Sequence, residues 1–455
     1  MHPRISLALL SLLAWIVLIP PSRLAARGDF TVTSDPAGAA LVGFGVQMNP
    51  YLYCTPNRAE VTDENVADFE RKVLALRPQH VRVFFLQQWF DGRADDISKG
   101  DPRMADSFIR TCRLAQRAGA TINLTHWRGP WPEPEKMMAA FADTLEKLIR
   151  EHKLDAIRYV TVQNEVNYTK VTFETYQRLY RALDEELKRR GLRERIRIIS
   201  GDLVGENQQA WFKNIGETIA DVSDGYSIHV YWDYWDTAKL VRRLNEVPPI
   251  VAALPREQRR PLYVTEFGVR GHRGSARVEP GDHEDGTPIA QTPLAAMQLA
   301  WFQMEALNRG YVATVIWTLE DARYDRMMPY GLIGRAKDGW PLKPGYHMLR
   351  LFTHTIKPSW QAMRVEGALE GVKVAAARGP AGEVTVLALN RNEAPAISVA
   401  GLKPGVRLRQ FVWNARGDGK LSRGEAMQVD ATGEVAIELP PLALIALTTG
   451  AAQLE

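Results

Sequence analysis

Residues 41–356 of this chain show two alternating patterns of apolar and polar positions. Short runs rich in β-branched and aromatic residues have the length and composition of buried strands; they lie at 41–47, 80–86, 120–125, 157–163, 197–202, 225–231, 261–265 and 312–319. Between them, apolar residues recur every three or four positions, as at Val66, Phe69, Val73 and Leu76, which is the spacing of an amphipathic helix. The pattern therefore predicts eight strands that alternate with helices.

Eight strand–helix units within roughly 300 residues predict an α/β fold, the (β/α)₈ or TIM barrel. The alternative is a doubly wound open sheet, which often carries a Gly-rich phosphate loop after its first strand. The corresponding segment, Phe44-Gly45-Val46-Gln47-Met48, does not supply such a loop. The barrel is therefore the preferred fold.

The pattern changes after about residue 357. β-forming residues cluster at 372–377, 383–390, 397–402, 406–414 and 435–439, with turn signals such as Gly379-Pro380-Ala381-Gly382 between them. No amphipathic segment of helix length interrupts these clusters. We therefore predict a barrel domain at 28–356 followed by a small antiparallel β-sandwich at 357–455. The segment 29–33, before the barrel, is a candidate extra strand of that sandwich.

The N-terminus has the pattern of a secretory signal peptide. His2 and Arg4 precede an apolar run from Ile5 to Ile19, and the small residues Ala25-Ala26 follow. The run is shorter than the roughly 20 apolar residues that a membrane-spanning helix needs. We therefore expect residues 1–27 to direct export, to the periplasm or out of the cell. An uncleaved N-terminal membrane anchor is the alternative.

Charge and cysteine content narrow the class of function. The net charge of +4 is small for 455 residues, and no basic run with interleaved aromatic residues argues for nucleic-acid binding. Cys54 and Cys112 fit no metal spacing and are expected to be separate buried thiols, with a disulfide in an oxidising compartment as the alternative. Asp282-His283-Glu284-Asp285 lies in a polar stretch typical of a solvated loop. We therefore expect no metal and no other cofactor, and the oligomeric state stays open.

Two glutamates stand at the ends of predicted strands. Thr161-Val162-Gln163-Asn164-Glu165 and Tyr263-Val264-Thr265-Glu266-Phe267-Gly268 each place one carboxylate after an apolar run. The carboxyl ends of barrel strands converge on one face, where catalytic groups lie. Cleavage of a glycosidic bond needs one carboxylic acid to protonate the leaving oxygen and one carboxylate to attack or to activate water. We therefore interpret Glu165 and Glu266 as a candidate catalytic pair.

Other predicted strand ends deliver supporting side chains to the same face. They are Arg82, His126, Trp127, Asn164, His229, Tyr231, Trp232 and Trp317. A guanidinium and a phenol favour an ionised nucleophile, whereas indoles stack on sugar rings and amides or imidazoles bind hydroxyls. Arg270 and Arg273 follow the seventh strand, and Arg128 follows the third. Guanidinium groups suit bidentate binding of a carboxylate, so a glycan that contains uronic acid is the expected substrate class.

This set of residues resembles the retaining (β/α)₈-barrel glycoside hydrolases of clan A, which include cellulase/mannanase-like and xylosidase/iduronidase-like families. The most specific matches are Asn164-Glu165 on the fourth strand and Glu266 within Thr-Glu-Phe-Gly on the seventh. The resemblance implies that Glu165 is the acid/base, that Asn164 binds the sugar 2-hydroxyl, and that Glu266 is the nucleophile. The common Asn-Glu-Pro reads Asn164-Glu165-Val166 here, which leaves the family within the clan open.

The expected function is a cofactor-independent, retaining O-glycoside hydrolase that acts on a polysaccharide or an oligosaccharide. A non-catalytic component that binds or assembles an envelope polysaccharide is the alternative, and the intact glutamate pair argues against it. A barrel lyase or isomerase would usually need a metal or a lysine at a strand end, and neither is evident in the sequence.

Overall fold

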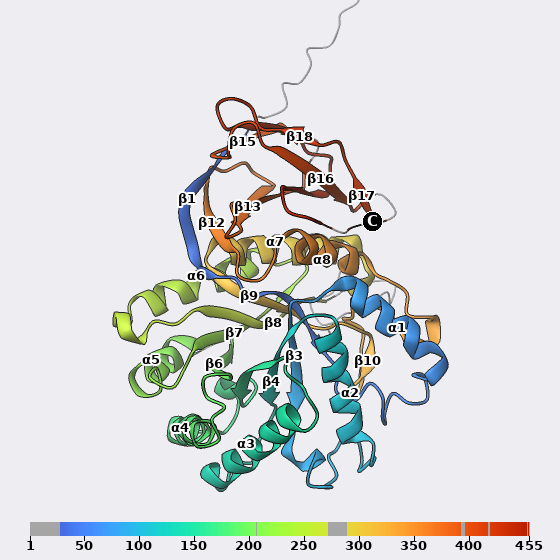
Figure 1. Ribbon diagram of the computed structural model, residues 1–455, viewed down its shortest axis with the longest axis vertical. Coiled ribbons are helices and arrows are strands. Elements are labelled where there is room, and N and C mark those ends of the chain that lie inside the picture. The colour runs from blue at the N-terminus through green and yellow to red at the C-terminus, as the bar shows by residue number, and fades with distance from the viewer. Residues whose placement is uncertain are drawn as a thin grey trace, which may run out of the picture.

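The computed structural model describes residues 28–205, 207–271, 289–392, 396–416, 419–452 and 454. Figure 1 shows a ring of strands surrounded by helices, with a second β-structure at one end. The predicted export segment, the Asp282–Asp285 stretch and Arg273 lie outside the described residues, and the expectations about them stay predictions. Within the described part of the chain, no helix is long and apolar enough to cross a membrane. Cys54 and Cys112 are buried as free thiols.

Eight parallel strands form a closed barrel in the order of the chain. They are β2 (Gly43–Met48), β3 (His80–Phe85), β4 (Thr121–His126), β5 (Ile157–Val162), β6 (Arg197–Val204), β7 (Gly225–Asp233), β8 (Leu262–Arg270) and β9 (Tyr311–Ile316). β2 pairs with both β3 and β9, so the ring closes. The predicted (β/α)₈ barrel is confirmed. A short hairpin of β10 (Ala322–Arg323) and β11 (Met327–Met328) follows β9.

Helices surround the barrel (Figure 1). They are α1 (Asp63–Leu76), α2 (Met104–Arg117), α3 (Pro134–Arg150), α4 (Phe173–Arg189), α5 (Gln208–Thr218), α6 (Thr237–Ala252), α7 (Pro293–Asn308) and α8 (Pro344–Thr355). The four apolar positions that predicted α1 are its buried residues. Thr62 and Asn65 form a capping box at its start, which satisfies two backbone N–H groups that the helix leaves unpaired.

The second sheet follows the order β17–β16–β20–β14–β13–β12–β1–β15–β19, with β18 beside β16. Its strands are β1 (Gly28–Ala40), β12 (Gln361–Glu366), β13 (Val372–Arg378), β14 (Val384–Asn390), β15 (Ala396–Ala400), β16 (Arg407–Asn414), β17 (Leu421–Arg423), β18 (Met427–Gln428), β19 (Val435–Glu438) and β20 (Ala443–Thr448). Leu408 of β16 and Ile437 of β19, near opposite ends of this order, share one apolar core. The sheet therefore folds over itself, as the predicted sandwich requires.

β1 connects the two parts of the molecule. It pairs antiparallel with β12 and parallel with β15, so the segment 29–33 does add a strand to the sandwich. The parallel pairing departs from the expected antiparallel sheet. β1 comes from the other end of the chain, and no hairpin turn therefore forces it to run opposite to β15. Residues 28–40, which the predicted boundaries place with the barrel, belong to the sandwich sheet.

Candidate active site at the mouth of the barrel

Arg82 of β3 is the centre of a network of polar groups inside the barrel. Its side chain is fully buried. Nη1 donates to Oε2 of Glu266 at 2.7 Å, and Nη2 donates to Oδ1 of Asn164 and Oδ2 of Asp202, each at 2.6 Å. Two further acceptors are Thr125 Oγ1 at 2.9 Å and Gln47 Oε1 at 3.2 Å. A buried guanidinium is costly unless it is paired, and these acceptors supply that pairing.

Both oxygens of Glu266 accept hydrogen bonds. Oε2 accepts from Arg82, and Oε1 accepts from the Tyr231 hydroxyl at 2.5 Å. Burial, and then the negative charge of Glu266, raise the pKa of Tyr231 well above its usual value of 10. The phenol therefore stays protonated and donates a hydrogen bond to Glu266. Glu266 is only 6% exposed, so nearly the whole residue is enclosed by the barrel. This arrangement suits a fixed, oriented nucleophile.

Glu165 lies three positions beyond the end of β5 and faces His229 of β7. Its Oε1 is 3.1 Å from Nδ1 of His229, and 31% of its side chain is exposed, much more than for Glu266. Its backbone has a φ of +48°, in the left-handed region that residues other than glycine rarely adopt. The short helix η2 (Val166–Tyr168) follows, and Asn167 bonds both the N–H and the C=O of Val204. The turn that carries Glu165 is therefore pinned to β6.

Glu165 and His229 behave as one proton-binding pair. Burial lowers the pKa of His229, but the negative charges of Glu266 and Asp202 outweigh burial and raise it to about 9. Burial raises the pKa of Glu165, but the contact with His229 outweighs burial, so the net shift is downward. Both shifts favour the proton on His229 over Glu165. To reach Glu165, the proton has to move only along the hydrogen bond between Nδ1 of His229 and Oε1 of Glu165.

Asp202 of β6 completes the network and was missed by sequence reasoning. It is fully buried, and its φ is +51°. Its Oδ2 accepts from Arg82, whereas its Oδ1 accepts from Thr265 at 2.5 Å and from Ser227 at 2.9 Å. Burial raises its pKa, but the charges of Arg82 and His229 outweigh burial and hold the pKa well below its usual range. A signal was present: Asp202 ends the predicted fifth strand, and Glu165 and Glu266 stand just beyond the ends of theirs.

Trp127 and Trp317 form an aromatic wall beside Arg82. Trp127 stacks on Phe84 with ring centroids 4.7 Å apart, and Trp317 stacks on Tyr324 at 5.3 Å. Phe84 joins the two pairs, since it lies 5.8 Å from Trp317 and 4.7 Å from the guanidinium carbon of Arg82. Both indoles are partly exposed. Their contact with sugar stays a prediction.

His126 and Trp232 do not reach the site, and their predicted roles are corrected. His126 packs against Trp131 and Phe141, and burial lowers its pKa to about 3. Trp232 is fully buried, and its Nε1 donates to Gln298 of α7 at 2.7 Å. Successive side chains of a strand face opposite sides. These two therefore point outward to the helices, while their neighbours Trp127 and Tyr231 serve the mouth.

Two of the predicted arginines lie near the mouth of the barrel. The guanidinium carbon of Arg270 lies 5.0 Å from the ring of Tyr231, the phenol that bonds Glu266. The guanidinium carbon of Arg128 lies 4.8 Å from the ring of Trp127. Arg128 also contacts the exposed Asp96 at 3.4 Å, which is long for a hydrogen bond. Two cations therefore flank the aromatic and carboxylate groups of the site.

The two glutamates are close together. One oxygen of Glu165, one oxygen of Glu266 and one ring nitrogen of His229 lie within 4.8 Å of one another. Retaining glycosidases hold their carboxyl groups about 5 Å apart, whereas inverting enzymes need roughly 6.5–9.5 Å. The same three atoms are near enough for one metal ion. Arg82 and Tyr231 already bond both oxygens of Glu266, however, which argues against a metal ion at this position.

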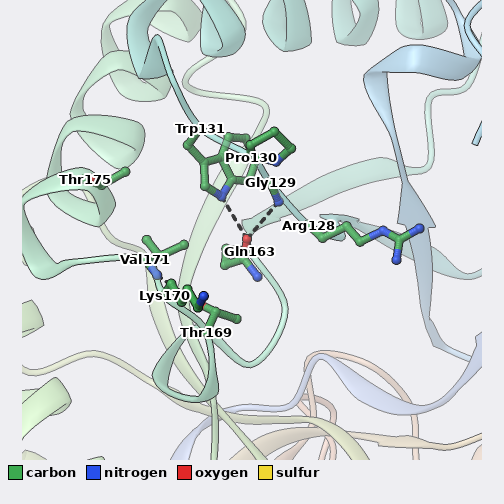
Figure 2. Close-up of a pocket in the computed structure, with 9 residues that line it drawn as sticks. All are labelled: Arg128, Gly129, Pro130, Trp131, Gln163, Thr169, Lys170, Val171 and Thr175. Carbon is green, nitrogen blue, oxygen red and sulfur yellow. Dashed lines mark hydrogen bonds between the residues drawn. The ribbon is translucent and has the colours of Figure 1, made fainter.

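A separate pocket of about 400 Å³ lies between the loops that follow β4 and β5 (Figure 2). Oε1 of Gln163 accepts from the N–H of Gly129 at 3.1 Å and from Nε1 of Trp131 at 2.8 Å, which ties the two loops together. A Cβ on Gly129 would lie 2.6 Å from the Trp131 ring, so this contact requires glycine. Neither Glu165 nor Glu266 lines this pocket, so the pocket is distinct from the candidate active site.

No protein-family model and no curated protein matches this sequence. Solved structures match the fold. They include the GH51 arabinofuranosidase from Xanthomonas axonopodis pv. citri, with a TM-score of 0.70 and 13% identity over 93% of this chain and 99% of that chain. The catalytic domain of GH30 xylanase C from Talaromyces cellulolyticus has a TM-score of 0.68 and 13% identity over 93% and 100% of the two chains. The GH30 endoxylanase from Clostridium papyrosolvens C71 has a TM-score of 0.64 and 14% identity, again over 93% and 100%.

At these identities the likeness concerns the fold. It covers nearly the full length of both chains in each comparison, so it includes the sandwich as well as the barrel. The fold expected from the resemblance to clan A is thereby confirmed. This chain has the barrel-and-sandwich fold of the solved GH30 and GH51 glycoside hydrolase structures.

Proposed function

We propose that this protein is a retaining O-glycoside hydrolase that cleaves a polysaccharide or an oligosaccharide by double displacement. One observation carries the proposal: two glutamates with oxygens within 4.8 Å of each other have different partners. Glu266 is bonded by Arg82 and Tyr231, whereas Glu165 contacts His229 and is more exposed. Carboxylates whose surroundings differ in this way can divide the roles of nucleophile and proton donor.

In the first step, an oxygen of Glu266 attacks the anomeric carbon while Glu165 protonates the leaving oxygen. Arg82 and Tyr231 orient the attacking carboxylate. Arg82 also uses Oδ1 of Asn164, so the amide nitrogen of Asn164 is the group that can donate to the sugar 2-hydroxyl. Trp127 and Trp317 provide apolar surfaces for the ring.

In the second step, Glu165 acts as the base that takes a proton from water. Once Glu266 is esterified, it no longer carries a negative charge. Loss of that neighbouring charge favours the ionised form of Glu165, which is the form that a base needs. Water then attacks the anomeric carbon and releases Glu266, so that two inversions leave the configuration unchanged.

A panel of aryl-glycosides and polysaccharides tests this proposal with the purified protein. We expect hydrolysis of at least one glycan class, with the anomeric configuration retained in the first product that proton NMR detects. Inverted product would contradict the double displacement. No hydrolysis of any member of the panel would favour the alternative of a non-catalytic glycan-binding protein.

We further propose that the substrate contains uronic acid, because Arg270 lies beside Tyr231 at the mouth. Arg270→Ala should raise KM for an acidic glycan by about tenfold to a hundredfold, since a charge-assisted hydrogen bond contributes about 1.5–3 kcal/mol. Neutral aryl-glycosides should change by about twofold or less. Arg256→Ala is the matched control, since this exposed arginine precedes β8 at the opposite end of the barrel. Equal effects of Arg270→Ala on acidic and neutral substrates would remove the basis for this substrate class.

A further inference from the structure

Asp202 contacts the partners of both glutamates. Its Oδ2 accepts from Arg82, which bonds Glu266. Its Oδ1 lies 3.5 Å from Nε2 of His229, and Nδ1 of the same ring is 3.1 Å from Glu165. A continuous chain of polar contacts therefore runs from one glutamate to the other, and Asp202 is its middle member.

The structure keeps Asp202 ionised without access to water. Thr265 and Ser227 donate to Oδ1, and Arg82 donates to Oδ2, so donors from three other strands surround the carboxylate. A buried carboxylate is tolerated only with such pairing. Glu165 after β5 and Glu266 on β8 also act on His229, and Arg82 on β3 bonds both Asp202 and Glu266.

The partner of one imidazole nitrogen decides the role of the other. A carboxylate can only accept, so Asp202 favours a proton on Nε2 of His229. Nδ1 is then able to accept from protonated Glu165 or to hold the shared proton itself. The proton can move across the 3.1 Å contact between Nδ1 and Glu165 while Nε2, which lies 3.5 Å from Asp202, keeps its own proton.

We propose that Asp202 is a positioning residue that fixes His229 with a proton on Nε2, so that the Glu165–His229 pair stores the proton for the leaving group. This inference rests on the proposed glycosidase function. In glycosylation the Nδ1–H bond breaks and an O–H bond forms on Glu165. That O–H bond then breaks as the leaving oxygen takes the proton together with the electron pair of the cleaved C–O bond. In deglycosylation, water returns one proton to the pair.

Asp202→Asn tests the proposal, because it keeps the size of the side chain and removes its charge. Without the neighbouring anion, the imidazole binds its proton less tightly, so the pair loses the proton at a lower pH. The alkaline limb of kcat/KM should therefore move down by about one pH unit or more. The loss at the optimum should be larger for poor leaving groups than for activated aryl-glycosides, because the latter need little protonation.

Two further variants separate this role from a merely structural one. Asp321→Asn alters another buried aspartate, which pairs with Lys343 at 2.6 Å outside the network, and it should lower stability without moving the alkaline limb. In a His229→Gln background the titrating imidazole is absent, so Asp202→Asn should give no further shift. An unmoved limb in folded Asp202→Asn protein, or the same shift in the His229→Gln background, would overturn the proposal.

Nitrogen-15 NMR of the His229 ring in the wild-type protein gives a test that does not depend on the variant folding. We expect a protonated Nε2 in the pH range where the ring is neutral. A neutral ring protonated on Nδ1 would also overturn the proposal. If the wild-type protein hydrolyses no glycan but shows the expected ring signals, the proposed function fails while the assignment of the proton stands.

Discussion

Glu266→Ala should lower kcat/KM on the order of 10⁴-fold or more for every substrate that the protein hydrolyses. Arg82 and Tyr231 would remain, but no oxygen would be present to form the bond to the anomeric carbon. The truncation also leaves a space beside two hydrogen-bond donors, which suits a small anion. With an activated aryl-glycoside, azide should therefore restore part of the rate and give a glycosyl azide of inverted configuration. Initial rates and proton NMR of the product measure both effects.

A matched variant separates loss of the nucleophile from loss of a buried charge. Glu305 of α7 is also buried and pairs at 2.8 Å with Lys373 of the sandwich strand β13, outside the site. Glu305→Ala should lower the melting temperature and leave kcat/KM per folded molecule nearly unchanged. Comparable activity losses in the two variants would show that the effect of Glu266→Ala is structural.

Glu165→Ala should separate substrates by their leaving groups. Removing a general acid costs about 10²–10⁴-fold where the leaving oxygen needs a proton. Natural glycans and aryl-glycosides with poor leaving groups should lose that much, whereas glycosylation by activated aryl-glycosides should change little. Azide can then attack the glycosyl-enzyme without a base and should give the retained azide. A plot of log kcat/KM against leaving-group pKa, steep in the variant and shallow in the wild type, is the measurement.

The two variants together decide the assignment of roles. The same dependence on leaving group in Glu165→Ala and Glu266→Ala would refute the division between proton donor and nucleophile. Exchanged behaviour, with inverted azide from Glu165→Ala, would reverse it. The geometry favours the assignment made here, because Tyr231 and Arg82 hold Glu266, while Glu165 is the more exposed carboxylate and has an imidazole as its partner.

The strand ends explain why some site residues could be predicted and others could not. An irregularity in the pairing of β7 with β8 places Thr265 opposite no partner, with Ile228 paired to Val264 and His229 to Glu266. Thr265 and Glu266 therefore both face the interior, where they bond Asp202 and Arg82. A similar irregularity in β6 lies between Ser200 and Leu203, around Asp202. Such bulges break the alternation from which a sequence predicts the direction of a side chain, and they are frequent next to active sites.

The sequence by itself determined the eight strand–helix units, the sandwich and the placement of Glu165 and Glu266 at strand ends, because periodicity and local composition carry that information. It could not distinguish inward His229 and Tyr231 from outward His126 and Trp232, since a shift of one position reverses the face. It also could not show that Asp202 meets Arg82 and His229, which lie 120 and 27 positions away in the chain. The contact of Asp202 with Arg82 and His229 depends on the tertiary structure. Closure of the barrel and the local bulges are what bring the ends of β3, β6 and β7 to one point.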